Sequence, residues 1–281
     1  MNAETISDAL KQGALYLSAV TDVPLLEAEV LLAHVLKYDR SQLYIFSERE
    51  ITSDQLEHFF LLINKRQQGE PIAYLTGHKE FWSLDLEVNP DVLIPRPETE
   101  VLVEEMLKLP LPKNALIADL GTGSGAIALA LAKEKPDWIL HAVDIHPAAI
   151  KIAGRNARHH HLNNIIFHQG NWCEGLPALK FDAIVSNPPY IAENDPDFSP
   201  NVKRFEPLSA LISADSGLQD LKAIISTAKN FLKTPGFLLV EHGFNQRKEV
   251  VSIFEKAGYT SINTFQDLAS LDRVTIGTYQ G

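Results

Sequence analysis

Residues 116–131 read Leu116-Ile117-Ala118-Asp119-Leu120-Gly121-Thr122-Gly123-Ser124-Gly125-Ala126-Ile127-Ala128-Leu129-Ala130-Leu131. The apolar residues before the glycines predict a buried strand, and the alanine- and leucine-rich run after them predicts a helix. The glycines between the two allow a tight turn that brings the backbone close to a ligand, beside the unpaired N–H groups of the helix start. This order of elements indicates an α/β fold whose first turn binds a ligand.

Strands and helices continue to alternate after this unit. We expect strands over Ile139–Val143, Ile165–His168, Phe181–Ser186 and Gly236–Glu241, helices over Leu218–Leu232 and Gln246–Ala257, and two closing strands. Alternation of this kind is typical of a largely parallel sheet covered by helices.

The part of the chain before residue 97 has a different character. Ala28–Leu36 places apolar residues at helical spacing, and Thr52-Ser53-Asp54-Gln55 predicts a capped helix start. Phe81–Val88 alternates apolar and polar residues, as a half-buried strand or hairpin does, and Pro97-Glu98-Thr99-Glu100 predicts the capped start of a further helix. We therefore expect three parts: a helical domain over 1–70 that is either a packing platform or a docking domain, a β-hairpin connector over 71–96, and the α/β domain over 97–281.

The charge of the chain argues against a duplex-DNA-binding protein. Its 36 Asp and Glu outnumber its 25 Lys and Arg, for a net charge of −11. Residues 1–90 alone hold 14 acidic and 7 basic side chains, a net −7. Proteins that grip DNA phosphates carry a basic surface instead.

Cysteine usage and the N-terminus bear on location. The single cysteine, Cys173, can form neither an internal disulfide nor a multi-cysteine zinc site, which fits a reducing compartment. Met1-Asn2-Ala3-Glu4 carries an early acid, and no long apolar run follows it. We expect a cytoplasmic protein with no signal peptide and no membrane contact.

Polar and aromatic residues follow the next two strands at their carboxyl ends, where α/β sheets bind ligands. Asp144 ends the second strand, where one carboxylate can bind both hydroxyls of a ribose; the alternative role is a cap for the helix that opens at Pro147. Asn171 and Trp172 follow the third strand. They fit an adenine pocket in which the amide bonds the base edge and the ring covers the base face.

The spacing of the glycines in the turn distinguishes between two classes of bound cofactor. A nicotinamide dinucleotide site would carry Gly-x-Gly-x-x-Gly against a pyrophosphate. Here the turn departs from that spacing and lies beside Asp119, which repels a phosphate and attracts the ammonium of a methionyl group. These features favour S-adenosylmethionine.

Asn187-Pro188-Pro189-Tyr190 forms a stiff turn after the strand Phe181–Ser186. Pro189 cannot join a β-ladder, so the strand must end before it, and the residue before each proline is held extended. The turn presents a side-chain amide, a carbonyl and an aromatic ring, which together fit a planar amino group. A proline-rich loop whose asparagine caps its own backbone is the alternative.

Further segments carry less information. Ile94–Thr99 is rigid and charged and is either functional or a surface loop, whereas Arg204–Leu208 lies in a polar segment, 191–216, that is long enough to favour a function. We interpret His159-His160-His161 as a solvated helix end, because histidines that bind a metal from one helix face need i, i+4 spacing. Cys173 is expected in a pocket or the core.

In combination, these motifs resemble the class I methyltransferases that modify planar nitrogen. Gly69–Gly77, Leu93–Glu100 and Arg204–Pro207 narrow the resemblance to the bacterial release-factor glutamine methyltransferase family (PrmC/HemK), over nearly the whole chain. Position 171 is Asn where this family usually has Asp. An amide can still accept a hydrogen bond from the adenine amino group.

The resemblance implies a class I, Rossmann-like, seven-stranded mixed sheet behind a small helical domain. It implies methyl transfer from S-adenosylmethionine to N5 of the glutamine in the Gly-Gly-Gln motif of release factors, in translation termination, by a monomer that needs no metal and no nucleic acid. The implied catalytic residues are Asn187, Pro188 and Tyr190, and the implied substrate-binding residues add Pro189, Arg96 and Glu98. The implied cofactor-binding residues are Asp119, Gly121, Thr122, Gly123, Ser124, Gly125, Asp144, Asn171, Trp172 and Asn187.

Three alternatives stay open at this point. Methylation of another protein glutamine, for example in a ribosomal protein, shares most of the same chemistry. An adenine-N6 DNA methyltransferase shares the Asn-Pro-Pro-Tyr turn, yet it would need base flipping and a basic recognition domain. The third alternative is a binding module without activity. The intact Asn187-Pro188-Pro189-Tyr190 turn argues against it, because a module without activity would not need this turn.

Overall fold

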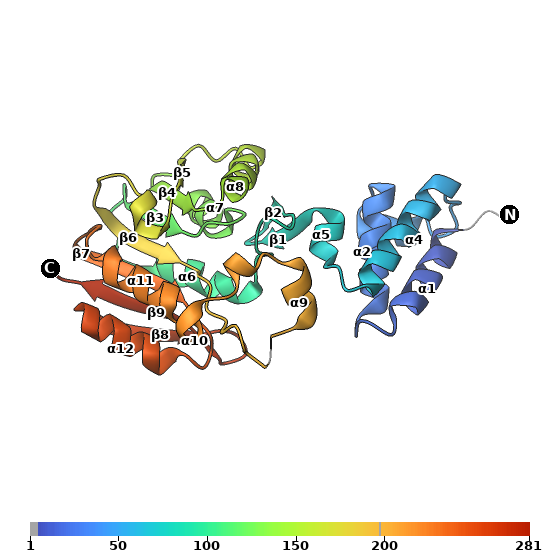
Figure 1. Ribbon diagram of the computed structural model, residues 1–281. Helices are drawn as coiled ribbons and strands as arrows, with labels where there is room; N and C mark the ends of the chain where they lie inside the picture. Colours follow the sequence, from blue (N-terminus) through green and yellow to red (C-terminus); the bar gives the residue numbers. More distant parts are fainter. Residues whose placement is uncertain (1–4, 197) are drawn as a thin grey trace. The chain divides into compact units, whose positions relative to one another are not determined.

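The computed structural model describes residues 5–196 and 198–281. Contacts divide the chain into two compact units, Met1–His78 and Lys79–Gly281, which are coloured blue to cyan and cyan to red in Figure 1. No helix within the described residues is both long and apolar enough to cross a bilayer.

The first unit is helical. Its helices are α1 (Ile6–Leu17), α2 (Pro24–Leu36), α3 (Arg40–Ile45), α4 (Ser53–Gln67) and α5 (Ile72–Thr76). The expected start of α4 is confirmed, because the Thr52 hydroxyl accepts from the Gln55 N–H while the Gln55 side chain accepts from the Thr52 N–H. Helices α1 and α4 approach closely at Gly13, where a Cβ would lie 2.6 Å from the Phe59 ring.

The second unit is built on a mixed sheet. Its seven described strands lie in the order β5-β4-β3-β6-β7-β9-β8, with β9 antiparallel to both of its neighbours and the other pairs parallel. The strands are β3 (Leu116–Leu120), β4 (Ile139–Asp144), β5 (Ile165–Gln169), β6 (Phe181–Ser186), β7 (Leu232–Glu241), β8 (Thr260–Gln266) and β9 (Asp272–Tyr279). A separate hairpin, β1 (His78–Phe81) and β2 (Leu84–Glu87), precedes them. The expected α/β fold with a seven-stranded mixed sheet is confirmed.

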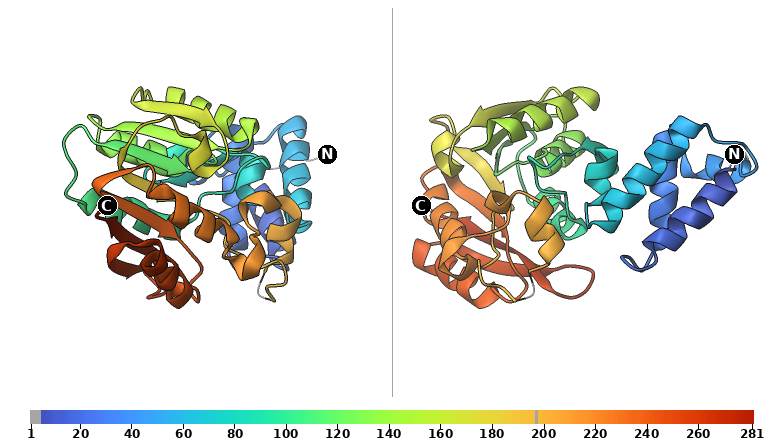
Figure 2. Two further views of the ribbon diagram at one scale, coloured as in Figure 1. Left: turned by 60° about the vertical axis from the view of Figure 1, so that its left-hand side comes forward. Right: turned by 45° about the vertical axis from the view of Figure 1, so that its right-hand side comes forward.

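Helices cover both faces of the sheet, because successive residues of a buried strand point to opposite faces. Ile117 and Leu239 pack with α6 (Glu100–Lys108) and α7 (Ala126–Glu134), whereas Ala118 and Leu238 pack with α11 (Gln219–Ala228) and α12 (Arg247–Ala257). The helix α8 (Pro147–His159) lies on the first face and contacts β4 and β5. Figure 2 shows this layering from two further sides.

Two expectations about local structure are wrong. The helix expected over Leu218–Leu232 ends at Ala228, because Leu232 is buried and pairs with Phe181 as the first residue of β7. The helix that starts after Pro97-Glu98-Thr99 does form, through the 3-10 turn η1 (Pro97–Thr99) and α6, but the Thr99 hydroxyl does not cap it. That hydroxyl is bonded elsewhere, as described below.

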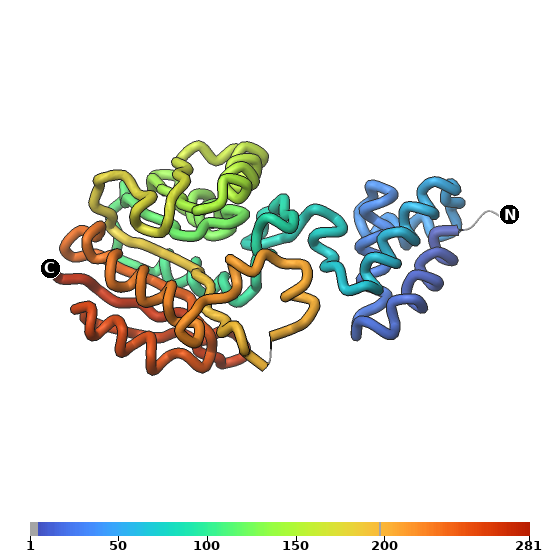
Figure 3. Tube along the Cα trace, viewed as in Figure 1, coloured from blue at the N-terminus to red at the C-terminus, as the bar shows by residue number. Residues whose placement is uncertain are grey.

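The described residues of the polar segment, 191–196 and 198–216, are largely structured. They include α9 (Pro200–Phe205), η3 (Leu208–Ala210) and the start of α10 (Ala214–Gly217), and Ile191 and Ile212 form an isolated parallel bridge. Figure 3 traces this orange segment between β6 and α11. The segment therefore leaves the sheet beside the Asn-Pro-Pro-Tyr turn and returns to the same place.

Candidate active site

A cavity of about 330 Å³ opens at the carboxyl ends of β3, β4, β5 and β6 in the second unit. Six of the residues predicted to bind the cofactor line it: Gly121, Gly123, Asp144, Asn171, Trp172 and Asn187. Parallel strands bring their carboxyl ends to one edge of a sheet, which explains why residues 66 positions apart, from Gly121 to Asn187, meet in one cavity.

Gly121 and Trp172 shape one wall of this first cavity. Gly121 has φ +75°, and a Cβ there would lie 2.9 Å from Cζ3 of Trp172. The Trp172 ring is held in place because its Nε1–H donates to Asp220 Oδ1 at 3.2 Å. Asp220 also lines the cavity and was not predicted.

Asp144 accepts backbone hydrogen bonds on both sides of its strand end, but α8 has no side-chain cap, and the ribose role of Asp144 stays a prediction. Its Oδ1 accepts from the His146 N–H at 2.9 Å, just before α8 begins at Pro147, and its Oδ2 accepts from the Gly123 N–H at 2.9 Å. These bonds fix the carboxylate against the glycine turn. A carboxylate has about four lone-pair sites, so acceptor capacity remains for a ligand in the cavity.

Asp119 lies behind the glycine turn and does not line the cavity. It is fully buried, its Oδ2 accepts from the Thr122 hydroxyl at 2.7 Å, and its Oδ1 has no hydrogen-bond partner among the described residues. Burial raises the pKa of Asp119 to about 7, although the hydrogen bond from Thr122 acts in the opposite direction and lowers it. A nearby cation would favour the ionised form, so the site fits a positively charged ligand group.

The remaining residues of the glycine turn support the cavity from outside. Thr122, Ser124 and Gly125 do not line it. Gly125 is a packing glycine, since a Cβ there would lie 2.4 Å from Leu129 Cδ1 and 3.1 Å from Ala153 Cβ. The turn is therefore seated tightly on α7 and α8.

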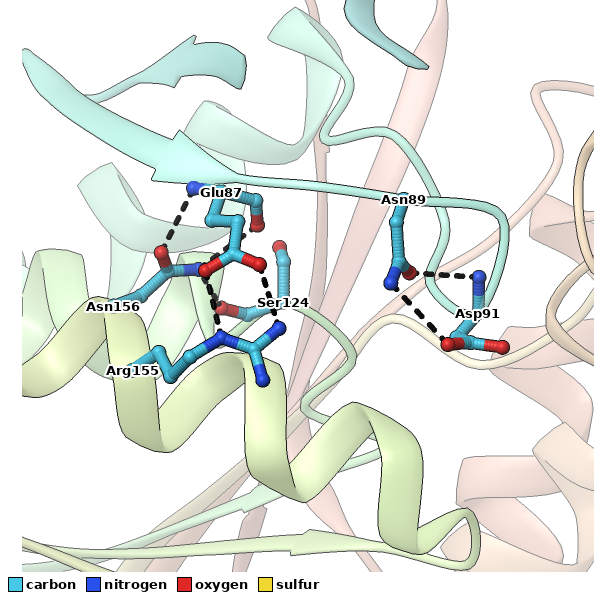
Figure 4. A network of polar contacts seen from close by, with 6 residues as sticks. All are labelled: Glu87, Asn89, Asp91, Ser124, Arg155 and Asn156. Carbon is cyan, nitrogen blue, oxygen red and sulfur yellow. Dashed lines mark hydrogen bonds and ion pairs between the residues drawn. The ribbon is translucent and has the colours of Figure 1, made fainter. Parts of the chain in front are cut away.

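A polar network centred on Asn156 of α8 anchors the turn to the hairpin (Figure 4). The Asn156 Nδ2 group donates to the carbonyls of Ser124 (2.9 Å) and Glu87 (3.1 Å), and its Oδ1 accepts from the Glu87 N–H at 2.8 Å. Arg155 forms a two-point ion pair with the Glu87 carboxylate. Asn156 is only 2% exposed, and its bond to the Ser124 carbonyl is buried, so this bond is shielded from water.

A second cavity, of about 250 Å³, adjoins the first at Asn187. Of these two cavities, Pro188, Tyr190 and Arg96 line only the second, whereas Pro189 lines only the first. Asn187 lines both. Of the residues predicted to bind substrate, only Glu98 lines neither; it is half-buried, and its role stays a prediction.

Arg96 links the two rigid charged segments that the sequence singled out. Its Nη2 donates to Oε1 of the buried Glu206 at 2.5 Å, and the Ile94 N–H donates to Glu206 Oε2 at 3.2 Å. These two hydrogen bonds hold the segment Ile94–Thr99 against the segment Arg204–Leu208 beside the second cavity. A buried carboxylate satisfied from two sides in this way is a strong local constraint.

Besides Asp220, two further functional candidates escaped the sequence analysis. Thr99 Oγ1 accepts from Asn187 Nδ2 at 3.0 Å, and the buried Glu241 accepts from the Tyr190 hydroxyl at 3.2 Å. Glu241 carried a visible signal, because an acid follows the apolar run Phe237–Val240 at the end of β7, next to the strand that leads into Asn187.

None of the described residues that were interpreted as unrelated to the site lines either of these two cavities. His159 is the last residue of α8, and His160 follows as its C-cap. Cys173 is 2% exposed within the core, and burial raises the pKa of its thiol, as expected for an unreactive packing residue.

Comparisons with known proteins agree over nearly the whole chain. The family model described as PrmC N-terminal domain matches residues 8–77, and the one described as methyltransferase small domain matches residues 97–203. A release factor glutamine methyltransferase from Coxiella burnetii is 45% identical over 273 residues, covering 97% of this chain and 98% of the relative. One from Escherichia coli K12 is 47% identical over 259 residues, covering 92% and 94%.

Solved structures share the fold at low identity. A methyltransferase from Pyrococcus furiosus superposes with a TM-score of 0.55 at 18% identity, over 82% of this chain and all of that one. The 16S rRNA N2 G1207 methyltransferase (RsmC) of T. thermophilus, solved with AdoMet and guanosine, gives a TM-score of 0.55 at 17% identity, over 72% of this chain and 50% of that one.

Proposed function

The chain belongs to the family of release factor glutamine methyltransferases, and from this premise we propose that it methylates N5 of the glutamine in the Gly-Gly-Gln motif of peptide-chain release factors. S-adenosylmethionine is the methyl donor. The observation that carries the proposal is the position of Asn187, which lines both cavities together with Leu93 and Ala210. A donor in the first cavity and an amide in the second would meet at this residue.

The residues of the first cavity fit S-adenosylmethionine. Asp144 offers a fixed carboxylate for the ribose hydroxyls, and Asn171 and Trp172 offer an amide and a ring for the adenine. The unpartnered Oδ1 of the buried Asp119 lies behind the glycine turn, where a cationic amino group would stabilise its ionised form. When bound, the cofactor supplies an electrophilic methyl group on a sulfonium.

Asn187 and Pro188 would position the substrate. An amide nitrogen is a poor nucleophile, because its lone pair is delocalised into the carbonyl. The Asn187 side-chain oxygen and the Pro188 backbone carbonyl would accept the two N–H bonds of the glutamine amide and hold its nitrogen toward the first cavity. As the nitrogen becomes positive during transfer, these acceptors bind it more strongly, so positioning and electrostatics act together.

Tyr190 would pack against the planar amide of the substrate. Its hydroxyl is bonded to Glu241, and burial raises its pKa, so it stays a neutral phenol at physiological pH. The ring is therefore a rigid wall of the second cavity rather than an acid or a base.

The partner and the location follow from the same proposal. An acidic helical domain over residues 1–70 would dock and steer a basic partner from the translation apparatus, with 71–96 as connector and 97–281 as the catalytic domain. We place the enzyme in the cytoplasm as a monomer that acts on release factors during translation termination, without direct contact to nucleic acid or membrane.

Methyl transfer from labelled S-adenosylmethionine tests the proposal. Purified release factor, its Gln→Ala Gly-Gly-Gln variant, a ribosomal protein fraction and plasmid DNA are offered side by side. Label on the wild-type factor alone is the expected result. Label on the Gln→Ala variant, or on ribosomal protein or DNA but not on the release factor, would overturn the substrate assignment.

A further inference from the structure

We propose that Asp220 and Ser213 are positioning residues that couple the first cavity to the Asn-Pro-Pro-Tyr turn, so that a cofactor packed against Trp172 fixes the backbone that follows the turn. The inference deepens the proposed function and rests on it for its binding and kinetic tests. The four residues Trp172, Asp220, Ser213 and Ile191 are called the Asp220 network below.

Asp220 holds together two groups from different parts of the site. It lines the first cavity, and its Oδ1 accepts from the Trp172 Nε1–H at 3.2 Å. Its Oδ2 accepts from the Ser213 hydroxyl at 2.6 Å. An ionised carboxylate only accepts, whereas an indole N–H only donates. A single carboxylate therefore satisfies both donors, which no side chain with one acceptor oxygen would do.

Ser213 connects Asp220 to the turn. Its hydroxyl gives its one proton to Asp220, and its oxygen accepts from the Asp220 N–H at 3.1 Å. The Ser213 N–H donates to the Ile191 carbonyl at 2.9 Å, and Ile191 directly follows Tyr190. Ser213 is 2% exposed and lines neither of the two cavities, so its effect on a ligand must be exerted through other residues.

The segment that contains Ser213, residues 211–217, contacts the backbone at the end of the turn. The Ile191 N–H donates to the Leu211 carbonyl at 2.9 Å, so Ile191 is bonded to the segment through both its N–H and its carbonyl. Gly217 approaches the residue before it, because a Cβ at Gly217 would lie 2.1 Å from the Tyr190 carbonyl oxygen. A shift of the segment must therefore move Tyr190 and Ile191 as well.

Gln246 reinforces this contact. Its Nε2 group donates to the carbonyls of Tyr190 (3.0 Å) and Ser216 (3.4 Å), so one side chain bridges the turn and the segment. The direction of the amide is fixed, since Gln246 Oε1 accepts from the Gly243 N–H at 2.8 Å.

The backbone of the segment depends on these bonds. Asp215, Ser216 and Gly217 have φ values of +54°, +56° and +84°, a left-handed run that is unfavourable for the two residues that carry a Cβ. Trp172 is also left-handed, at φ +44°. Such conformations persist where the surrounding bonds over-determine them. Loss of the bond between Ser213 and Asp220 should therefore let the segment relax while both cavities keep their lining residues.

Cofactor and substrate should consequently strengthen each other's binding. An adenine packed on the Trp172 ring would order its Nε1–H, and through Asp220 and Ser213 it would order the backbone at Ile191. The substrate then meets a turn that is already ordered, which favours its binding. By linkage, the substrate must raise the affinity for the cofactor by the same factor.

The binding test measures the release factor Kd with and without saturating S-adenosylhomocysteine, which lacks the methyl group and allows no transfer. In the wild-type protein the ligand should tighten release factor binding about fivefold or more. In Ser213→Ala the effect should be at most twofold, with the cofactor Kd within threefold of wild type. Asp220→Asn, which leaves one acceptor oxygen for two donors, should lose the coupling as well.

The kinetic test uses the same variants and a matched control. Thr275→Val removes a buried hydroxyl bonded to His242 in the same sheet and should keep the wild-type coupling and kcat. At saturating cofactor, kcat should fall at least fivefold in Ser213→Ala. Coupling retained in Ser213→Ala, its absence from the wild-type protein, or a kcat restored by saturating cofactor would overturn the inference.

A further measurement does not depend on the substrate. The backbone amide of Ile191, assigned by its loss from ¹⁵N-isoleucine-labelled protein in Ile191→Val, is followed by ¹H–¹⁵N NMR as S-adenosylhomocysteine is added. Its signal should shift in the wild-type protein and in Thr275→Val, and not in Ser213→Ala. An equal shift in Ser213→Ala would overturn the inference. A shift that Ser213→Ala abolishes, in a protein that neither binds nor methylates release factor, would instead reject the proposed function alone.

Discussion

Gly121→Ala tests whether the contact between the glycine turn and Trp172 shapes the cofactor cavity. The substitution has two separable consequences. Gly121 has φ +75°, a region in which a residue with a Cβ loses about 1–2 kcal/mol. The new Cβ would also lie 2.9 Å from the Trp172 ring, 0.5 Å inside the 3.4 Å at which ordinary contact begins.

Gly258→Ala separates these consequences. Gly258 has φ +89° in the same unit, and a Cβ there meets nothing within 4 Å. Both variants should therefore lose about 1–2 kcal/mol of unfolding free energy through the backbone. Only Gly121→Ala must also displace the ring whose Nε1–H is held by Asp220, at a wall of the first cavity.

Isothermal titration with S-adenosylmethionine and thermal unfolding of both variants provide the assay. We expect Gly121→Ala to bind the cofactor at least tenfold more weakly than Gly258→Ala, a difference of about 1.4 kcal/mol. Equal cofactor affinity in two variants of equal stability would show that the Trp172 ring does not shape the binding site.

Four further predictions concern the same site and its support. Asn187→Ala should lower kcat by about 10²–10³ while cofactor Kd, measured by titration, stays nearly constant; a parallel loss of cofactor binding would mean that Asn187 acts through the first cavity. Asp144→Ala should raise the cofactor Kd before it affects kcat, and an unchanged Kd would refute its ribose role. Asn156→Ala removes three hydrogen bonds, one buried and two partly buried, and should lower the unfolding free energy in urea by about 2–4 kcal/mol; a loss below 1 kcal/mol would contradict the anchoring of the turn. Burial lowers the pKa values of His141 and His168 from 6.5 in the folded protein, so the unfolded state takes up more protons below that pH and stability is lost as the pH falls. His168→Gln should therefore lose less stability than wild type between pH 7 and pH 5, and identical pH slopes would refute this.

The glycine turn and the Asn-Pro-Pro-Tyr turn could be located from sequence because their chemistry is local. Proline ends a strand through its own ring, and Gly121 tolerates a positive φ because it lacks a Cβ. Buried parallel strands also have a clear apolar signature, which is why β3, β4, β5 and β6 fall within a residue of where they were expected. Asp144 could be singled out because it is an acid at the end of such a strand.

Tertiary structure decided which other residues of the chain these residues contact. Nothing near Thr99 in the sequence indicates that its hydroxyl leaves the helix start and bonds Asn187, 88 positions away. Pairing of Leu232 with Phe181 similarly ended α11 earlier than helical periodicity suggests. Both outcomes depend on which strands and turns become neighbours in the sheet, and local propensity carries no information about that.

The sequence thus determined the fold class and the groups available for chemistry, since strand periodicity, proline and glycine act within a few residues. The folded sheet alone decided how those groups are oriented. The Asn187 amide meets the Thr99 hydroxyl, and the Tyr190 hydroxyl meets Glu241, only because the fold brings together residues 88 and 51 positions apart in the chain.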